Sequence, residues 1–209
     1  MTKPRPQDVF ATRAQPLVAA RTALLVIDAQ NWVLDEPARQ PRPEFYEDAR
    51  GFVIPNIARL IAACRERCIE VVYTVMENET LDGRDRSLDY KLSDFFIAKG
   101  SHNARVIPEL APGPDEMVIP KTSSSLFNST NFDYLMRNIG IDTVIVTGFL
   151  TDQCCDHTIR DGADRGYHMI CVEDGCATDT RARHRAALAA FGGYCVTETT
   201  DSLVARMGQ

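Results

Sequence analysis

The sequence has no long apolar run and no surplus of basic residues. No stretch of about 18 apolar residues, the length that spans a bilayer, occurs in it. Residues 1–20 are polar and lack the apolar core of a secretion signal, which predicts a cytoplasmic protein. Lys and Arg number 23 against 29 Asp and Glu, giving a net charge of -6. Because an acidic surface repels phosphate backbones, we expect neither nucleic acid nor membrane among the partners.

The usual motifs of cofactor binding are also missing. No G-x-G-x-x-G follows a predicted strand, and G-x-x-x-x-G-K-[ST] does not occur. The four histidines form neither H-x-x-x-H nor D-x-H, so the sequence predicts no protein-held metal and no cofactor. The G-x-S-x-G elbow of serine α/β-hydrolases is absent as well.

The seven cysteines do not form a disulfide pattern. Their number is odd, and the chain of 209 residues is too long for a small disulfide scaffold. Several are flanked by apolar residues, which predicts small buried side chains. Cys154 and Cys155 are adjacent and lack the C-x-x-C spacing of thiol redox enzymes.

Short apolar runs alternate with segments of helical periodicity. The runs at 22–27, 69–75, 117–120, 142–147, 169–172 and 194–197 are typical of strands, and 52–68, 128–138, 154–165 and 180–191 of helices. This alternation predicts an α/β fold with a mainly parallel six-stranded sheet. We expect an N-terminal extension over 1–20 and a single domain over 21–209. The charged stretch 77–105 is predicted to be an insertion near the site, with one short helix around 90–97.

Three reactive side chains follow the ends of predicted strands. Asp28 follows the first strand, Lys121 the third, and Cys154 comes a few residues after the fourth. Ligands of open α/β sheets bind beyond the carboxyl ends of the strands, so the three could form one site. Taken singly, each has an ordinary explanation: an inert buried thiol, a turn-capping carboxylate and a surface ammonium.

Cys154 is predicted to open the helix 154–165. There the helix dipole, backbone N–H groups and a nearby Lys121 would lower the pKa of its thiol and favour the nucleophilic thiolate. Asp28, at the end of an apolar strand, is suited to take the thiol proton and return it to a leaving amine. Candidates for the substrate pocket are Gln30, Trp32, Ser125, Phe127, Asn128, Phe149 and Gln153.

Three motifs resemble the isochorismatase-like cysteine hydrolase family. They are LLVIDAQ around Asp28, IPKTSSSLF around Lys121 and VTGFLTDQCCDHTIRDGADRGY around Cys154, and the likeness extends from about Ala23 to Val204. The resemblance implies a three-layer α/β/α fold and an Asp–Lys–Cys triad of Asp28, Lys121 and Cys154. It also implies a cis peptide bond between Phe149 and Leu150, an oxyanion hole formed by the N–H groups of Leu150 and Cys154, and a homodimer or homotetramer.

The resemblance also narrows the reaction. Nicotinamidases of the family carry a D-x-H metal motif where this chain has TVMENET, which argues against a metal-dependent nicotinamidase. The retained Cys154 favours hydrolysis of a C–N bond in a small amide, ureide or carbamoyl compound. The segment KTSSSLFNSTNFDYLMRNIGI resembles ureidoacrylate and biuret amidohydrolases. Two alternatives stay open: an isochorismatase-type vinyl-ether hydrolase and a non-catalytic binding member of the fold.

Overall fold

The computed structural model describes residue 13 and residues 15–34 and 42–208. Most of the extension predicted over 1–20 lies outside the described residues, so the division at residue 20 stays a prediction. None of the described helices is both long and apolar enough to cross a membrane.

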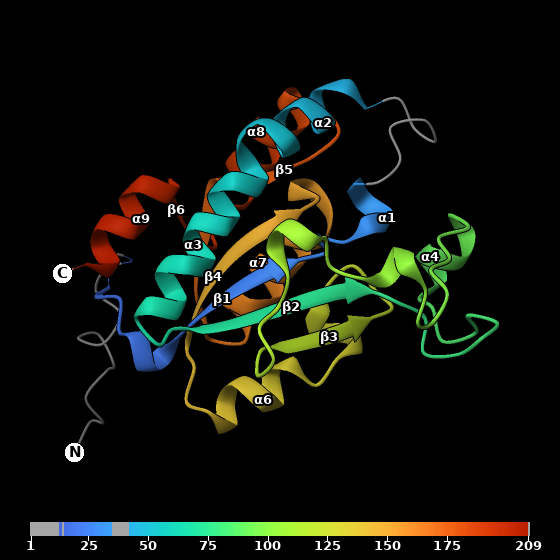
Figure 1. The fold of residues 1–209 in the computed structure, drawn as a ribbon, viewed down its shortest axis with the longest axis horizontal. Coiled ribbons are helices and arrows are strands. Elements are labelled where there is room, and N and C mark those ends of the chain that lie inside the picture. Colours follow the sequence, from blue (N-terminus) through green and yellow to red (C-terminus); the bar gives the residue numbers. More distant parts are fainter. Residues whose placement is uncertain (1–12, 14, 35–41, 209) are drawn as a thin grey trace, which may run out of the picture.

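A six-stranded parallel sheet forms the centre of the molecule (Figure 1), which confirms the predicted fold class. Its order is β3-β2-β1-β4-β5-β6, and every neighbouring pair is parallel. β1 and β4 are buried along their whole length, as expected for apolar runs covered on both faces. The strands are β1 (Thr22–Ile27), β2 (Glu70–Met76), β3 (Met117–Lys121), β4 (Thr143–Phe149), β5 (His168–Ala177) and β6 (Val196–Glu198).

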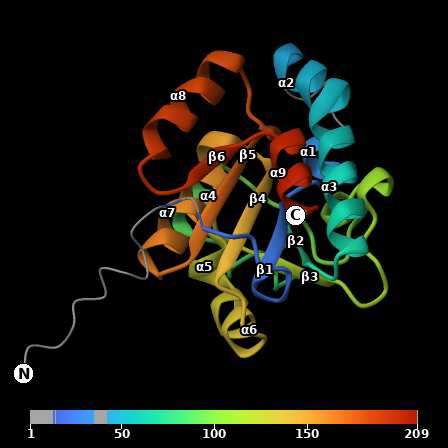
Figure 2. The same ribbon diagram turned by 90° about the vertical axis from the view of Figure 1, so that its left-hand side faces the viewer.

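Helices cover both faces of the sheet and complete the three layers (Figure 2). One face carries α2 (Pro43–Asp48), a π-helical turn (Ala49–Val53), α3 (Ile54–Glu66) and α9 (Thr200–Met207). The other carries α5 (Leu126–Ser129), α6 (Phe132–Asn138) and α7 (Asp156–Asp164), with α8 (Arg181–Phe191) packed beside α7. Short helices α1 (Asn31–Leu34) and α4 (Leu88–Leu92) lie beyond the carboxyl ends of β1 and β2 (Figure 1). The 3-10 turns are Ala19–Arg21, His102–Ala104 and Pro108–Leu110.

Several predicted boundaries differ from the structure. The helix expected over 128–138 is two helices, because Thr130 is extended, donates from Oγ1 to the Leu126 carbonyl and accepts from the Phe132 N–H. β5 continues to Ala177, past a register shift against β4 between Val146 and Gly148. The helix of the 77–105 insertion spans Leu88–Leu92 rather than 90–97, and α9 was not predicted.

Candidate active site

Parallel strands bring Asp28, Lys121 and Cys154 together at one edge of the sheet. Asp28 directly follows β1, and its N–H donates to the Thr74 carbonyl of β2 at 3.0 Å. Lys121 is the last residue of β3, two strands away from β1. Its Nζ lies 2.9 Å from Asp28 Oδ2 and donates to Cys154 Sγ at 3.3 Å. The three side chains expected to meet therefore do so, with the ammonium between the carboxylate and the sulfur.

The ion pair in this cluster is completely buried. The side chains of Asp28 and Lys121 are 0% exposed, and Cys154 is 5% exposed as a residue. Asp28 Oδ1 accepts a hydrogen bond from Thr74 Oγ1 at 3.0 Å, and Lys121 Nζ also donates to the Ser123 carbonyl at 3.1 Å. Buried charges persist only when paired and hydrogen-bonded, and these contacts meet that condition.

Opposing effects set the pKa of Lys121. Burial alone would lower it, because desolvation penalises the charged ammonium. The Asp28 carboxylate and the Cys154 sulfur act in the other direction and raise this pKa well above its ordinary value. Lys121 therefore stays a cation at the centre of the cluster.

The thiol differs from the sequence prediction. Burial raises the pKa of Cys154 to about 12, and Lys121 only partly opposes this rise. The expected lowering was wrong because the sulfur is shielded from water and Asp28 already supplies the negative charge that balances the ammonium. The Cys154 thiol is accordingly protonated at neutral pH.

Cys154 lies inside a π-helical turn, Thr151–Cys155, that precedes α7. The helix thus begins three residues earlier than predicted, and Cys154 does not open it. Helix α8 holds this turn in place: Thr151 Oγ1 is 2.8 Å from His184 Nδ1, and Arg183 Nε donates to Asp152 Oδ2 at 2.6 Å. These contacts fix the backbone that carries the sulfur.

The chain between β4 and this turn is closely fitted to β1. The peptide bond between Phe149 and Leu150 is cis. Gly148 has a φ of 112°, and a Cβ there would lie 2.0 Å from the Ile27 carbonyl oxygen, so the position requires glycine. Within the described residues, the Leu150 N–H donates to no backbone or side-chain acceptor. This donor is therefore free of protein acceptors, and the oxyanion hole of Leu150 and Cys154 stays a prediction.

The predicted pocket residues fall into three groups. Gln30 and Phe149 are buried and already engaged: the Gln30 amide bonds three backbone groups, and Phe149 packs edge-on to Phe45. Ser125 and Phe127 are buried, with Ser125 Oγ accepting from the Phe127 N–H and the Phe127 ring meeting that of Phe132 edge-on. Three residues keep accessible surface: Trp32, which is half-buried, and the exposed Asn128 and Gln153.

One site residue was missed by sequence reasoning. Tyr90 of α4 is 7% exposed, and its hydroxyl lies 4.0 Å from Cys154 Sγ. Its ring lies beside Phe95, whose ring meets Trp32 edge-on at 5.6 Å. The only signal in the sequence was its place in the 77–105 insertion, which was expected near the site.

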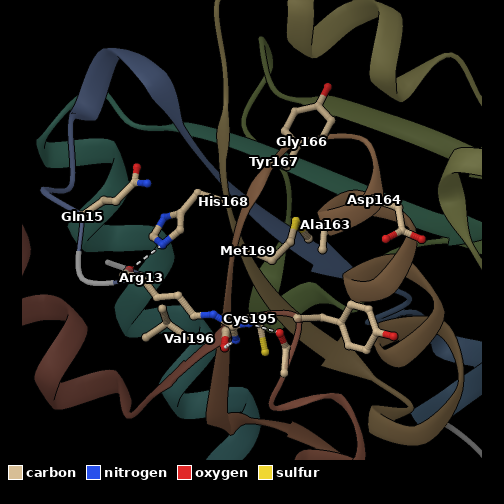
Figure 3. A pocket seen from close by; sticks show the side chains of 12 residues that line it. Arg13, Gln15, Ala163, Asp164, Gly166, Tyr167, His168, Met169, Cys195 and Val196 are labelled. Atoms are coloured by element: carbon tan, nitrogen blue, oxygen red, sulfur yellow. Dashed lines mark hydrogen bonds between the residues drawn. The ribbon is translucent and has the colours of Figure 1, made fainter. Parts of the chain in front are cut away.

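A cavity of about 510 Å³ lies at the other end of the sheet (Figure 3). Its lining includes Tyr167, His168 and Met169 at the amino end of β5, with Tyr194 before β6. The reactive cluster stands at the carboxyl ends of the strands, so this cavity is not part of it. Nowhere among the described residues do three or more His, Cys, Asp or Glu side chains gather in a metal-binding group.

Comparisons with known proteins show what the sequence and the fold resemble. The model of the isochorismatase domain matches residues 22–202. A ureidoacrylate amidohydrolase from Pantoea ananatis is 29% identical over 184 residues, covering 79% of this chain and 74% of that protein. A cysteine hydrolase structure from Pseudomonas syringae pv. phaseolicola superposes with a TM-score of 0.81 at 27% identity, covering 93% of this chain and 95% of the other. The N-carbamoylsarcosine amidase of Thermoplasma acidophilum gives 0.71 at 25% identity, covering 87% and 97%.

Proposed function

The chain belongs to the isochorismatase family, and on that premise we propose that it hydrolyses a C–N bond in a small amide, ureide or carbamoyl compound. The observation that carries the proposal is the buried cluster of Asp28, Lys121 and Cys154, in which Lys121 Nζ contacts both partners. A nucleophile, a base and a fixed cation within contact distance are the parts that covalent acyl transfer needs.

In the first step, the Cys154 thiol passes its proton to Asp28 as the sulfur attacks the substrate carbonyl carbon. Negative charge moves from the carboxylate to the sulfur and then to the carbonyl oxygen. Lys121 lies 2.9 Å from Asp28 and 3.3 Å from the sulfur, so it stabilises the charge at both of the first two positions. The high pKa of the buried thiol fits this concerted transfer, because no free thiolate has to accumulate.

The oxyanion is assigned to the N–H groups of Leu150 and Cys154. A donor already free of protein acceptors costs no reorganisation when the negative charge forms. The tetrahedral intermediate then collapses: the C–N bond breaks, and Asp28 returns the proton to the departing nitrogen. Ammonia or an amine leaves, and the acyl group remains on Cys154 as a thioester.

Water completes the cycle. Asp28, again a carboxylate, takes a proton from a water molecule that attacks the thioester carbonyl. The C–S bond breaks, the sulfur recovers its proton, and a carboxylic or carbamic acid is released. The names of two relatives support this substrate class, since one is a ureidoacrylate amidohydrolase and the other an N-carbamoylsarcosine amidase.

The proposal includes a cytoplasmic location and assembly as a homodimer or homotetramer. All seven cysteines are free thiols, which suits a reducing compartment. Sedimentation of the purified protein would give the assembly state: a mass of two or four chains supports the proposal, and a mass of one chain contradicts it.

Ammonia release from a panel of ureides and amides tests the function. We expect the wild-type protein to turn over at least one of them and Cys154→Ala to lose about 10⁴-fold or more in rate. Cys155→Ala is the matched control, because it removes the adjacent buried thiol and should keep the activity. Undiminished hydrolysis by Cys154→Ala would remove the thiol from the mechanism. If the wild type released no ammonia from any member of the panel, a vinyl-ether hydrolase would be left as the alternative.

A further inference from the structure

The 77–105 insertion is firmly attached to the core around the nucleophile. The Ser87 N–H donates to the Thr122 carbonyl, one residue after Lys121, at 2.9 Å. The Asn78 N–H donates to the Ile97 carbonyl at 2.9 Å and closes the base of the insertion. Ser87 Oγ then caps α4 by accepting from the Tyr90 N–H at 3.2 Å. Tyr90 is thus held by a helix cap one turn away from the backbone that positions Lys121.

The Tyr90 hydroxyl faces the reacting atom. It lies 4.0 Å from Cys154 Sγ and is buried with it. Burial raises the pKa of Tyr90 above its ordinary value, and Lys121 only partly opposes this effect, so the group stays a neutral hydroxyl. A phenolic hydroxyl can donate one hydrogen bond and accept another at the same time.

Attack by sulfur leaves three further bonds on the carbonyl carbon, and each needs a separate protein environment. The oxygen is directed to the N–H groups of Leu150 and Cys154. The leaving nitrogen must reach Asp28, which returns its proton. Among the described residues, three polar side chains lie within hydrogen-bonding distance of the sulfur: Lys121, Asp28 and Tyr90. Lys121 and Asp28 already serve the sulfur and the leaving nitrogen, so the third substituent lies on the side of Tyr90.

The third substituent differs between substrate classes. In a ureide it is a second nitrogen carrying an N–H, whereas in a simple carboxamide it is carbon. Before attack, the carbonyl carbon lies about 3–3.5 Å from the sulfur. The Tyr90 hydroxyl lies 4.0 Å from the same sulfur, so the third substituent on that carbon is within its reach. The Phe95 ring lies beside that of Tyr90, and the Trp32 ring meets Phe95 edge-on, so the three rings form one aromatic wall.

We propose that Tyr90 is a specificity-determining residue that accepts a hydrogen bond from the non-leaving N–H of a ureide. Phe95 and Trp32 extend this wall along the planar remainder of the substrate. The inference rests on the proposed function and deepens it: the insertion selects ureides over simple carboxamides of the same size. Tyr90 has no part in generating the nucleophile, so its removal affects the two substrate classes unequally.

The test compares Tyr90→Phe with wild type on a ureide and on its carboxamide isostere, in which the non-leaving NH is replaced by CH₂. Tyr90→Phe keeps the ring beside Phe95 and removes only the hydroxyl. We expect kcat/KM for the ureide to fall by about 10-fold to 100-fold, the range of one or two hydrogen-bond energies, and for the carboxamide to change less than about 3-fold. Tyr134→Phe, at a 69% exposed position of α6, is the matched control and should change neither value.

Equal losses on both substrates, or none on either, would overturn the specificity role of Tyr90. Those outcomes leave the proposed function intact, because the wild type still hydrolyses a C–N bond. Failure of the wild type to hydrolyse any member of the panel would instead refute the proposed function itself, and the role of Tyr90 with it.

Discussion

Replacement of Lys121 by methionine tests the energetics of the buried cluster. Lys121→Met keeps most of the side-chain volume and removes the charge, which leaves the Asp28 carboxylate buried opposite a thioether. The two charges are 2.9 Å apart and completely buried. At an effective dielectric constant of about 20, their attraction is about 6 kcal/mol, before desolvation is subtracted. Removal of one partner of such a pair typically costs about 3–5 kcal/mol.

We therefore expect the free energy of unfolding of Lys121→Met to fall by about 3–5 kcal/mol in urea titrations monitored by circular dichroism. The double variant Asp28→Asn/Lys121→Met, which has no buried charge, should recover much of that loss. Arg59→Met is the matched surface control: Arg59 lies 2.7 Å from Asp201, but the two side chains are 54% and 82% exposed. Its cost should stay below about 1 kcal/mol.

A loss below about 1 kcal/mol for Lys121→Met would refute the reasoning, because the buried pair would then behave like an exposed one. The reasoning would also be refuted if Asp28→Asn/Lys121→Met were less stable than Lys121→Met. In that case the remaining instability would come from packing around the methionine and not from an unpaired charge.

Two further predictions concern the thiol and the turn before it. Burial raises the pKa of Cys154 to about 12, so its alkylation by iodoacetamide at pH 7.5 should be slower than that of the exposed Cys68 in the same sample. The rate of Cys154 alkylation, followed by peptide mass spectrometry, should still increase with pH above pH 10. A plateau below pH 8 would contradict the protonated resting thiol. Gly148→Ala should cost at least about 3 kcal/mol of stability in urea, since its Cβ would lie 2.0 Å from the Ile27 oxygen. Gly166→Ala, at a φ of 86° with open space around it, should cost only about 1–2 kcal/mol. Equal losses of stability in the two variants would show that the backbone conformation, and not the contact with Ile27, sets the cost.

The sheet and the reactive cluster could be predicted because their signals are local. The run Thr22–Ile27 is apolar because every residue of β1 is buried, and its strand bounds match the prediction. Asp28 and Lys121 come at strand ends, and parallel strands place their carboxyl ends at the same edge. The meeting of these residues therefore follows from strand order and needs no knowledge of side-chain packing.

Other features depend on contacts between distant segments, which no local pattern records. The pKa of Cys154 is high because several elements, including α4, shield the sulfur from water, and its position near a helix start did not reveal this. Gln30 was assigned to the pocket from its place after β1, yet its amide joins the backbones of Met76 and Asn103. Tyr90 lies in a charged segment of weak periodicity, so its position against the sulfur required the structure.

The central claim is that Cys154 carries the acyl group, and peptide mass spectrometry of the trapped enzyme tests it most directly. Wild-type protein mixed with a ureide or amide that it hydrolyses is quenched in acid within the first turnover, and the digest is searched for the peptide that contains Cys154. We expect this peptide to gain the mass of the acyl group, and the Cys155→Ala protein to give the same adduct. Turnover without any adduct on Cys154, or an adduct on another cysteine, would contradict the account.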